Sequence, residues 1–102
     1  MIPNLKIDSE RLWAMLSDTA KFGGTPKGGV KRLTLTGEDK QVRDWFVAEM
    51  TALGCAVSFD EVGNLFARRP GKNPDLPPIA MGSHLDTQPT GGKFDGILGV
   101  LG

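Results

Sequence analysis

The sequence has a single cysteine and a single histidine among its 102 residues, and no excess of charge of either sign. One cysteine excludes an internal disulfide. We interpret Cys55, at the start of an expected strand, as a small buried hydrophobic residue and not as a nucleophile or ligand. Twelve basic and twelve acidic residues give a formal net charge of zero. This balance argues against binding of nucleic acid or membranes through charge.

Long hydrophobic runs are also missing. No segment approaches the roughly 18 continuous apolar residues of a membrane span, and residues 1–6 lack the apolar core of a signal peptide. We therefore expect a cytoplasmic protein. The hydrophobic content of 39% is ordinary for a globular fold, and the length is that of a common single domain.

A first helix is expected to begin near residue 8. Asp8 is placed to cap it, and Ile7 is placed to pack against Leu12 as a hydrophobic staple. Its apolar stripe consists of Leu12, Met15, Leu16 and Ala20. Residues 23–29 hold too many glycines for a helix or a strand, so they predict a loop. We interpret this loop as a flexible rim near the site, with Arg32 facing it.

A second helix and a hairpin follow. Thr36 and Asp39 form a capping box, and Gly54 ends the helix. The apolar face, which we interpret as core, consists of Val42, Trp45, Phe46, Met50 and Leu53 at helical spacing. Residues 56–59 and 64–67 have strand character and are joined by a short polar turn, which predicts a β-hairpin.

The last quarter of the chain brings the histidine close to two carboxylates. Residues 76–81 are apolar apart from two prolines and are typical of a short buried strand. His84 and Asp86 follow its carboxyl end, where open α/β sheets place their ligands. Residues two apart in an extended chain point to the same side, so these two side chains should emerge together. Glycines at 91–92 allow a sharp turn that brings Asp95 back toward His84.

The three side chains are chemically suited to a metal site. A neutral imidazole suits zinc and its neighbours in the transition series, and a carboxylate can hold two cations about 3.5 to 4 Å apart with its two oxygens. Asp95 is our candidate for that bridging role. Asp86 suits a supporting role, in which it fixes the tautomer and the angle of a metal-binding ring such as that of His84.

From the residues alone, interpretations without a metal stay open. A histidine near a strand end is commonly a hydrogen-bonded surface or core residue, and the spacing His-x-Asp occurs often by chance. Asp95 followed by Gly96 also suits a turn or a helix cap before residues 97–101. A serine or cysteine hydrolase is disfavoured, because the single histidine, once assigned to a metal, is not available as its general base.

Residues 82–101, with the sequence GSHLDTQPTGGKFDGILGVL, closely resemble the first metal-site motif of a family of dinuclear zinc amidohydrolases. That family includes N-carbamoyl-L-amino-acid hydrolase, beta-ureidopropionase and allantoate amidohydrolase. It is related to zinc peptidases of the aminoacylase and carboxypeptidase type. Residues 28–34 and 60–68 are similar to segments of the same enzymes, in the same order, so the resemblance covers essentially the whole chain.

The resemblance implies an α/β fold in which helices pack on a mixed sheet. Residues 1–102 would be an incomplete amino-terminal portion of a metal-hydrolase catalytic domain, without the lid or dimerisation domain and the remaining metal ligands. Two divalent ions are implied, zinc first, with Mn²⁺, Co²⁺ or Ni²⁺ as alternatives. His84 would bind one ion, Asp95 would bridge both, and Asp86 would support the site. The full-length parent is expected to be a homodimer.

The implied reaction is metal-dependent hydrolysis of a linear amide or ureido C–N bond, above all in an N-carbamoyl-L-amino acid or N-carbamoyl-beta-alanine. Gln88 leans toward this carbamoyl branch. The family also needs a glutamate pair, one member of which is the general base, and further histidines that lie downstream, so this chain alone is expected to be inactive. Its expected partner is a small-molecule substrate, not nucleic acid or a membrane. Two alternatives stay open: a fragment of an aminoacylase or metallopeptidase, and a non-catalytic binding module.

Overall fold

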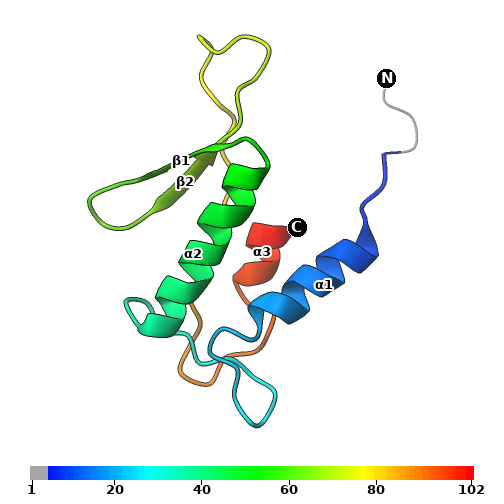
Figure 1. Ribbon diagram of the computed structural model, residues 1–102, viewed down its shortest axis with the longest axis vertical. Coiled ribbons are helices and arrows are strands. Elements are labelled where there is room, and N and C mark those ends of the chain that lie inside the picture. Colours follow the sequence, from blue (N-terminus) through cyan, green and yellow to red (C-terminus); the bar gives the residue numbers. More distant parts are fainter. Residues whose placement is uncertain (1–4) are drawn as a thin grey trace.

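The computed structural model describes residues 5–102. Its elements in chain order are α1 (Ser9–Thr19), α2 (Gly37–Ala52), β1 (Ala56–Phe59), β2 (Leu65–Arg68) and α3 (Ile97–Leu101) (Figure 1). The predicted α/β class is confirmed, and the sheet within these residues is an antiparallel pair. Every helix in this part of the chain falls short of what a membrane crossing requires. The signal-peptide argument rests mainly on residues 1–4, which lie outside the described residues.

The core lies where the three helices meet, with α3 between α1 and α2 (Figure 1). Leu16 of α1, Val42 of α2 and Ile97 of α3 are 5%, 0% and 1% exposed. The partly buried residues packed against them are Leu12, Phe22, Trp45, Leu85, Val100 and Leu101. Residues three or four apart share a helix face, which places Leu12 beside Leu16 and Trp45 beside Val42. The core positions predicted for these residues are therefore confirmed.

Local hydrogen bonds define both ends of α1. The Asp8 carboxylate accepts from the N–H three residues later at 3.0 Å, so the predicted cap is confirmed. Ile7 is 77% exposed, and the predicted staple onto Leu12 is wrong. Figure 1 shows that the chain before α1 leads away from the other helices. At the far end, the buried Thr19 hydroxyl donates to the Met15 carbonyl at 2.9 Å, which satisfies it inside the core.

The ends of α2 follow the predicted signals with one shift. The Thr36 hydroxyl accepts from the Asp39 N–H at 3.3 Å, but the Asp39 carboxylate accepts from the N–H of Leu35 at 3.1 Å and not from Thr36. Leu35 has a φ of +68°, the left-handed conformation, which alters the entry of the chain into the helix. Gly54, with a φ of +81°, ends the helix as predicted. Leu53 caps the helix and leaves its inner face, so its predicted core position is wrong at 56% exposure.

The predicted hairpin is confirmed, with β1 and β2 paired antiparallel along their whole length. Asp60 organises the turn, because its carboxylate accepts from the backbone N–H of Asn64 at 2.8 Å and from the Asn64 side chain at 2.7 Å. The side-chain bond from Asn64 is the main reason that the pKa of Asp60 is lowered. Arg43 of α2 donates to the Gly63 carbonyl at 2.7 Å and ties the turn to the helix. Cys55, just before β1, is half-buried.

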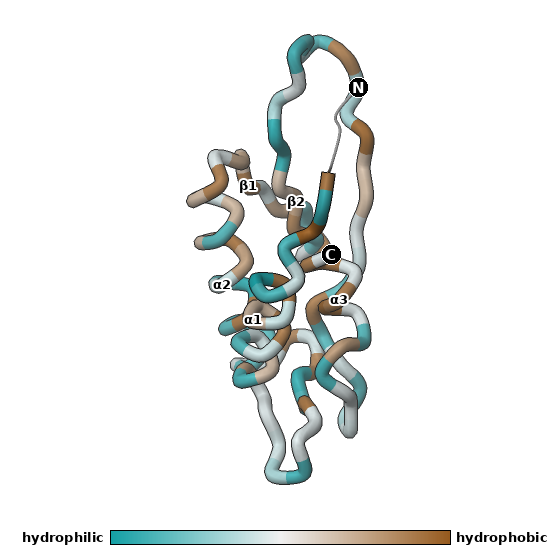
Figure 2. The backbone as a smooth tube through the Cα atoms, turned by 90° about the vertical axis from the view of Figure 1, so that its right-hand side faces the viewer, coloured by the Kyte–Doolittle hydropathy of each residue, from teal (hydrophilic) through white to brown (hydrophobic). Residues whose placement is uncertain are grey.

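Residues 69–83 form a long exposed excursion, and the buried strand predicted at 76–81 is wrong. Ile79 and Met81 are both 94% exposed, and no strand is assigned in this segment. Figures 1 and 2 show the segment projecting beyond the hairpin, with hydrophobic residues along one arm. Pro77 and Pro78 carry no N–H, and no other part of residues 5–102 pairs with this stretch. Its apolar pattern therefore has nothing to pack against.

Candidate metal site

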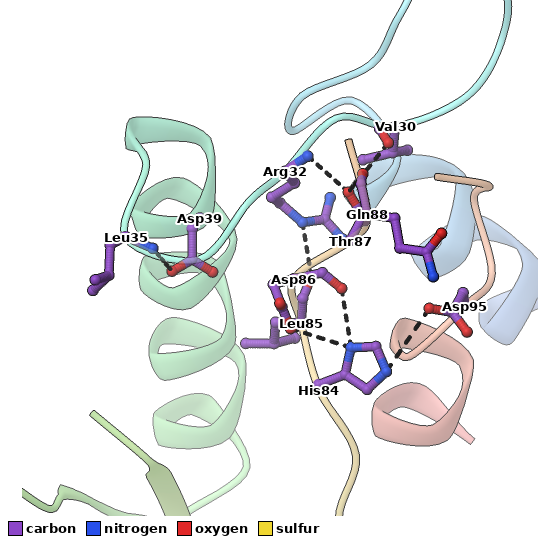
Figure 3. A network of polar contacts seen from close by, with 10 residues as sticks. All are labelled: Val30, Arg32, Leu35, Asp39, His84, Leu85, Asp86, Thr87, Gln88 and Asp95. Atoms are coloured by element: carbon purple, nitrogen blue, oxygen red, sulfur yellow. Dashed lines mark hydrogen bonds and ion pairs between the residues drawn. The ribbon is translucent and has the colours of Figure 1, made fainter. Parts of the chain in front are cut away.

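His84 lies between two carboxylates (Figure 3). Its Nδ1 is 3.0 Å from the backbone carbonyl oxygen of Asp86 and 3.2 Å from the Asp86 carboxylate. Its Nε2 is 3.8 Å from the Asp95 carboxylate. The structure thus brings together the three side chains that the sequence singled out. Their roles as ligands and support stay predictions.

The partners of the His84 ring determine which nitrogen is available. Both oxygens near Nδ1 are acceptors, so we assign the proton of the neutral ring to Nδ1. The lone pair is then on Nε2, the nitrogen that faces Asp95. The side chains of His84, Asp86 and Asp95 are 53%, 38% and 67% exposed, so solvent screens their mutual attraction. The carboxylate of Asp86 therefore acts through hydrogen-bond geometry more than through charge.

His84 and Asp95 fit a shared cation in reach and in chemistry. A Zn–N bond and a Zn–O bond of about 2.1 Å each together exceed the separation of the two atoms, which is 3.8 Å. One ion can therefore touch both. Within residues 5–102, no three His, Cys, Asp or Glu side chains gather closely enough to hold a metal ion. The described chain thus offers a pair of ligands, fewer than the four of a closed zinc site.

The loop that carries these side chains is fastened to the segment before α2. The Thr87 N–H donates to the Arg32 carbonyl at 2.7 Å, and the Thr87 hydroxyl accepts from the Arg32 N–H at 2.8 Å. Val30 and Gly91 exchange two backbone hydrogen bonds of 2.9 and 3.0 Å. Thr87 and Val30 are 6% and 1% exposed, so these contacts are shielded from water. They hold residues 84–91 as a rigid platform.

Gly96 is required where α3 meets the histidine. It has a φ of +71°, and a Cβ there would collide with the His84 ring and lie 2.6 Å from the His84 carbonyl oxygen. Gly99, one turn later, lies against Ser83 in the same way. The chain therefore turns into α3 directly over the ring, and the helix predicted at 97–101 is confirmed. Both glycines permit close packing, and Gly96 also permits the turn into α3.

Arg32 does not face the site from a flexible rim, and that prediction is wrong. The residue is 1% exposed. Its Nε donates to the Leu85 carbonyl at 2.9 Å, and its Nη1 donates to the carbonyls of Thr19 and Phe22 at 2.9 and 2.7 Å. Burial lowers the pKa of Arg32, while Asp39 and Asp86 oppose that shift. The local sequence carries no signal for this burial, because the carbonyls that accept from Arg32 are 10 to 53 positions away.

An aromatic pair connects the loop to α1 next to Asp95. The rings of Trp13 in α1 and Phe94 lie with centroids 5.9 Å apart and planes tilted by 34°. Tilted aromatic pairs at this separation are favourable. Phe94 immediately precedes Asp95, so the contact ties the backbone of that carboxylate to α1. The sequence patterns did not indicate this pair.

Comparison with known proteins identifies the relatives of this arrangement. The N-carbamoyl-L-amino-acid amidohydrolase of Rhizobium meliloti is 47% identical over 98 residues, which cover 96% of this chain and 24% of that protein. A solved hydantoinase/carbamoylase family amidase from Burkholderia ambifaria matches with a TM-score of 0.93 at 55% identity, over 95% of this chain and 24% of that one. A second amidase of that family, from Burkholderia vietnamiensis, matches with a TM-score of 0.95 at 52% identity, over 99% of this chain and 24% of that one. The homologues of this chain are amidohydrolases.

The other homologues include two ureidoglycolate hydrolases and an allantoate amidohydrolase, whose names indicate related ureido substrates. No family model matches the chain. The chain spans about a quarter of the length of the amidohydrolases it matches. The resemblance to N-carbamoyl-L-amino-acid and allantoate amidohydrolases is confirmed. Its finer parts, the pair of zinc ions and the likeness to beta-ureidopropionase, stay predictions.

Proposed function

We propose that this chain is the segment of an amidohydrolase that supplies His84 and Asp95 as ligands to a pair of divalent cations. Asp86 supports the site by holding His84. The observation that carries the proposal is the 3.8 Å approach of His84 Nε2 to the Asp95 carboxylate. It occurs in a chain that is 47% identical to an N-carbamoyl-L-amino-acid amidohydrolase. Zinc is the first candidate, and Mn²⁺, Co²⁺ and Ni²⁺ also suit imidazole and carboxylate ligands.

Each residue has a separate task in this proposal. Asp86 keeps the proton of His84 on Nδ1 and sets the ring angle, so that Nε2 is free to bind. Asp95 offers two carboxylate oxygens, one for each cation. Divalent cations in such a site supply Lewis acidity toward an amide or ureido carbonyl. The substrate class is a linear ureido or amide compound, with N-carbamoyl amino acids first and Gln88 beside the site as the residue that favours them.

The isolated chain is expected to be inactive. His84 and Asp95 offer one ion at most two protein ligands, because within residues 5–102 no third His, Cys, Asp or Glu joins them closely enough to hold a metal ion. We assign the base and the other ligands to parts of the parent enzyme beyond this segment. Measurable hydrolysis of N-carbamoyl amino acids by the purified 102-residue chain would contradict this assignment.

A chimera tests the proposal directly. The 98 matched residues of the Rhizobium meliloti amidohydrolase are replaced by those of this chain, and ammonia release from N-carbamoyl-L-amino acids is measured. We expect an active, metal-containing chimera. His84→Ala and Asp95→Ala should each abolish measurable turnover, because a ligand is lost. Asp86→Asn should lower it by about 10- to 100-fold, the usual effect of removing a group that orients a ligand.

A matched control and other substrates sharpen the chimera experiment. Asp75→Asn removes an exposed carboxylate in the excursion at 69–83 and should leave turnover unchanged. Full activity of the Asp95→Ala chimera would refute the ligand assignment. Assays with allantoate, ureidoglycolate and N-acetyl amino acids in parallel separate the ureido class from the aminoacylase alternative. An inactive chimera with intact folding would favour a non-catalytic binding module.

The wider proposals concern the parent protein. We place residues 1–102 in the amino-terminal portion of a catalytic domain and expect the parent to be a cytoplasmic homodimer that also accepts N-carbamoyl-beta-alanine. Sequence resemblance supports these statements. Size-exclusion chromatography of the parent and its kinetics with N-carbamoyl-beta-alanine test the oligomeric state and the substrate.

A further inference from the structure

Arg32 is the one buried cation among residues 5–102, and it forms no ion pair within them. Its guanidinium donates instead to three backbone carbonyls, those of Thr19 and Phe22 at the end of α1 and that of Leu85. Taking a guanidinium out of water is costly unless its donors are satisfied. Simple packing could be achieved by an apolar side chain of similar length. The polar head must therefore do something that packing alone does not.

The position of its partners shows what that is (Figure 3). Leu85 stands between His84 and Asp86, and its carbonyl is held by the Arg32 side chain at 2.9 Å. Thr87, the next residue but one, is held by the Arg32 backbone at 2.7 and 2.8 Å. The Leu85 side chain is also packed against the core. Arg32 therefore fixes the backbone at Leu85, where the chain bends, and at Thr87.

The chain bends at Leu85, so strand geometry does not by itself set the orientation of His84 and Asp86. Holding the backbone at Leu85 and Thr87 fixes the positions from which the side chains of His84 and Asp86 leave the chain. The 3.2 Å contact between His84 Nδ1 and the Asp86 carboxylate depends on those fixed positions. A single residue thus connects the end of α1 to the geometry of the histidine.

We propose that Arg32 is the positioning residue of the candidate metal site, which sets the orientation of His84 and Asp86 by holding Leu85 and Thr87. Its consequence for metal binding rests on the proposed function, whereas its consequence for the His84 ring does not. Lysine cannot replace it, because one ammonium group lacks the planar fork that reaches three carbonyls at once.

The nitrogen resonances of the His84 ring test the proposal, and they can be assigned without ambiguity because the chain has no other histidine. Two-bond ¹H–¹⁵N correlation spectra distinguish the two tautomers of a neutral imidazole, and they are recorded at about pH 8, above the ordinary pKa of histidine side chains. The folded wild-type chain should show a single ring dominated by the form protonated on Nδ1. In Arg32→Met and Arg32→Lys, the nitrogen shifts should move toward those of a free, averaging imidazole, without rescue by lysine.

Arg43→Met is the matched control. Arg43 also donates to a backbone carbonyl, that of Gly63 at 2.7 Å, but it ties α2 to the hairpin turn. It should lower stability and leave the His84 nitrogen shifts unchanged. A purely structural role of Arg32 predicts the same behaviour for both arginines. Folded Arg32→Met with wild-type His84 shifts would overturn the proposal.

Two further measurements keep the test decisive. If both Arg32 variants fail to fold, the wild-type chain is examined for slow solvent exchange of the Arg32 Nε–H and for its coupling across the hydrogen bond to the Leu85 carbonyl. Rapid exchange without coupling would refute the proposal. Zn²⁺ titration should shift His84 Nε2 in the wild type and require about 10- to 100-fold more zinc in Arg32→Met. No response of the wild type to Zn²⁺ contradicts the proposed function, and the tautomer pattern then decides the positioning role by itself.

Discussion

Two regions of the molecule hold similar apolar residues in opposite surroundings. The buried cluster consists of Leu16, Val42 and Ile97, none of them more than 5% exposed. The open segment consists of residues 69–83, all of which are exposed. Ile97 in the cluster and Ile79 in the open segment are the same residue type at 1% and 94% exposure. Hydrophobicity is identical, so the difference is whether a partner surface exists.

The contrast shows which kinds of structure this chain completes by itself. A helix satisfies its own backbone, so α1, α2 and α3 need only one another's apolar faces to close the core. An extended segment needs hydrogen-bonding neighbours as well as packing. The open segment finds neither within residues 5–102. The homologues are about four times as long, and under the proposed function the rest of the parent enzyme would supply these partners.

The largest expected effect on stability comes from replacing one of the two isoleucines by alanine. Ile97→Ala should lower the free energy of unfolding by about 2–5 kcal/mol, because a fully buried side chain leaves a cavity. Ile79→Ala, at 94% exposure, should change it by less than about 0.5 kcal/mol. Urea unfolding followed by circular dichroism measures both. A large loss from Ile79→Ala would mean that the open segment packs in solution.

Gly96→Ala probes the close approach of α3 to His84. Alanine at a φ of +71° is strained and its Cβ meets the His84 ring, so we expect a loss of about 1–3 kcal/mol. The His84 ring resonances should also shift. Gly92→Ala is the control, since no atom lies within 4 Å of a Cβ at that position. Equal stability of the two variants in urea would disprove the close packing.

Thr87→Val removes a buried hydroxyl while keeping the shape of the side chain. The N–H of Arg32, which donates to that hydroxyl at 2.8 Å, would lose its acceptor at a cost of about 1–3 kcal/mol. Thr90→Val, in the exposed part of the same loop, should be nearly neutral. Thermal unfolding of both variants provides the measurement. The idea of a fastened platform fails if Thr87→Val is as stable as the wild type.

The smallest effect concerns the hairpin, which lies beside the open segment. The hydrogen bonds from Asn64 lower the pKa of Asp60 below its ordinary value of 3.8. A lowered carboxyl pKa contributes stability above the unfolded value and loses it as the pH falls through the folded value. The Asn64 amide resonance should therefore move toward its random-coil position between about pH 5 and about pH 2. Asp60→Ala should remove that pH dependence, and its persistence in the variant would assign the titration to another group.

Features governed by nearby residues could be predicted from the sequence. The Asp8 cap, the Gly54 helix end and the hairpin turn each depend on hydrogen bonds spanning a few positions. The juxtaposition of His84 and Asp86 is also local, because the two residues are two positions apart, although the chain bends at Leu85 between them and is not extended. The glycines at 91–92 predict the turn that brings Asp95 back toward His84. The sequence alone was therefore sufficient to predict these three residues as a candidate site.

Features that depend on distant residues were missed or wrong. Arg32 bonds to Leu85, 53 positions away, and to the end of α1, so its burial could not be read from its neighbours. The segment at 76–81 has the composition of a buried strand, but composition does not supply a pairing partner. Ile7 is 77% exposed and does not form the predicted staple.

By itself, the sequence determined the helix ends, the hairpin, the trio of His84, Asp86 and Asp95, and the likeness to amidohydrolases. Tertiary structure alone decided that Arg32 is buried beneath that trio and that Ile97, not Ile79, belongs to the core. The physical reason is the distance along the chain over which each kind of interaction is decided. Backbone hydrogen bonds in caps and turns are settled within a few residues, whereas desolvation depends on which distant segments come together.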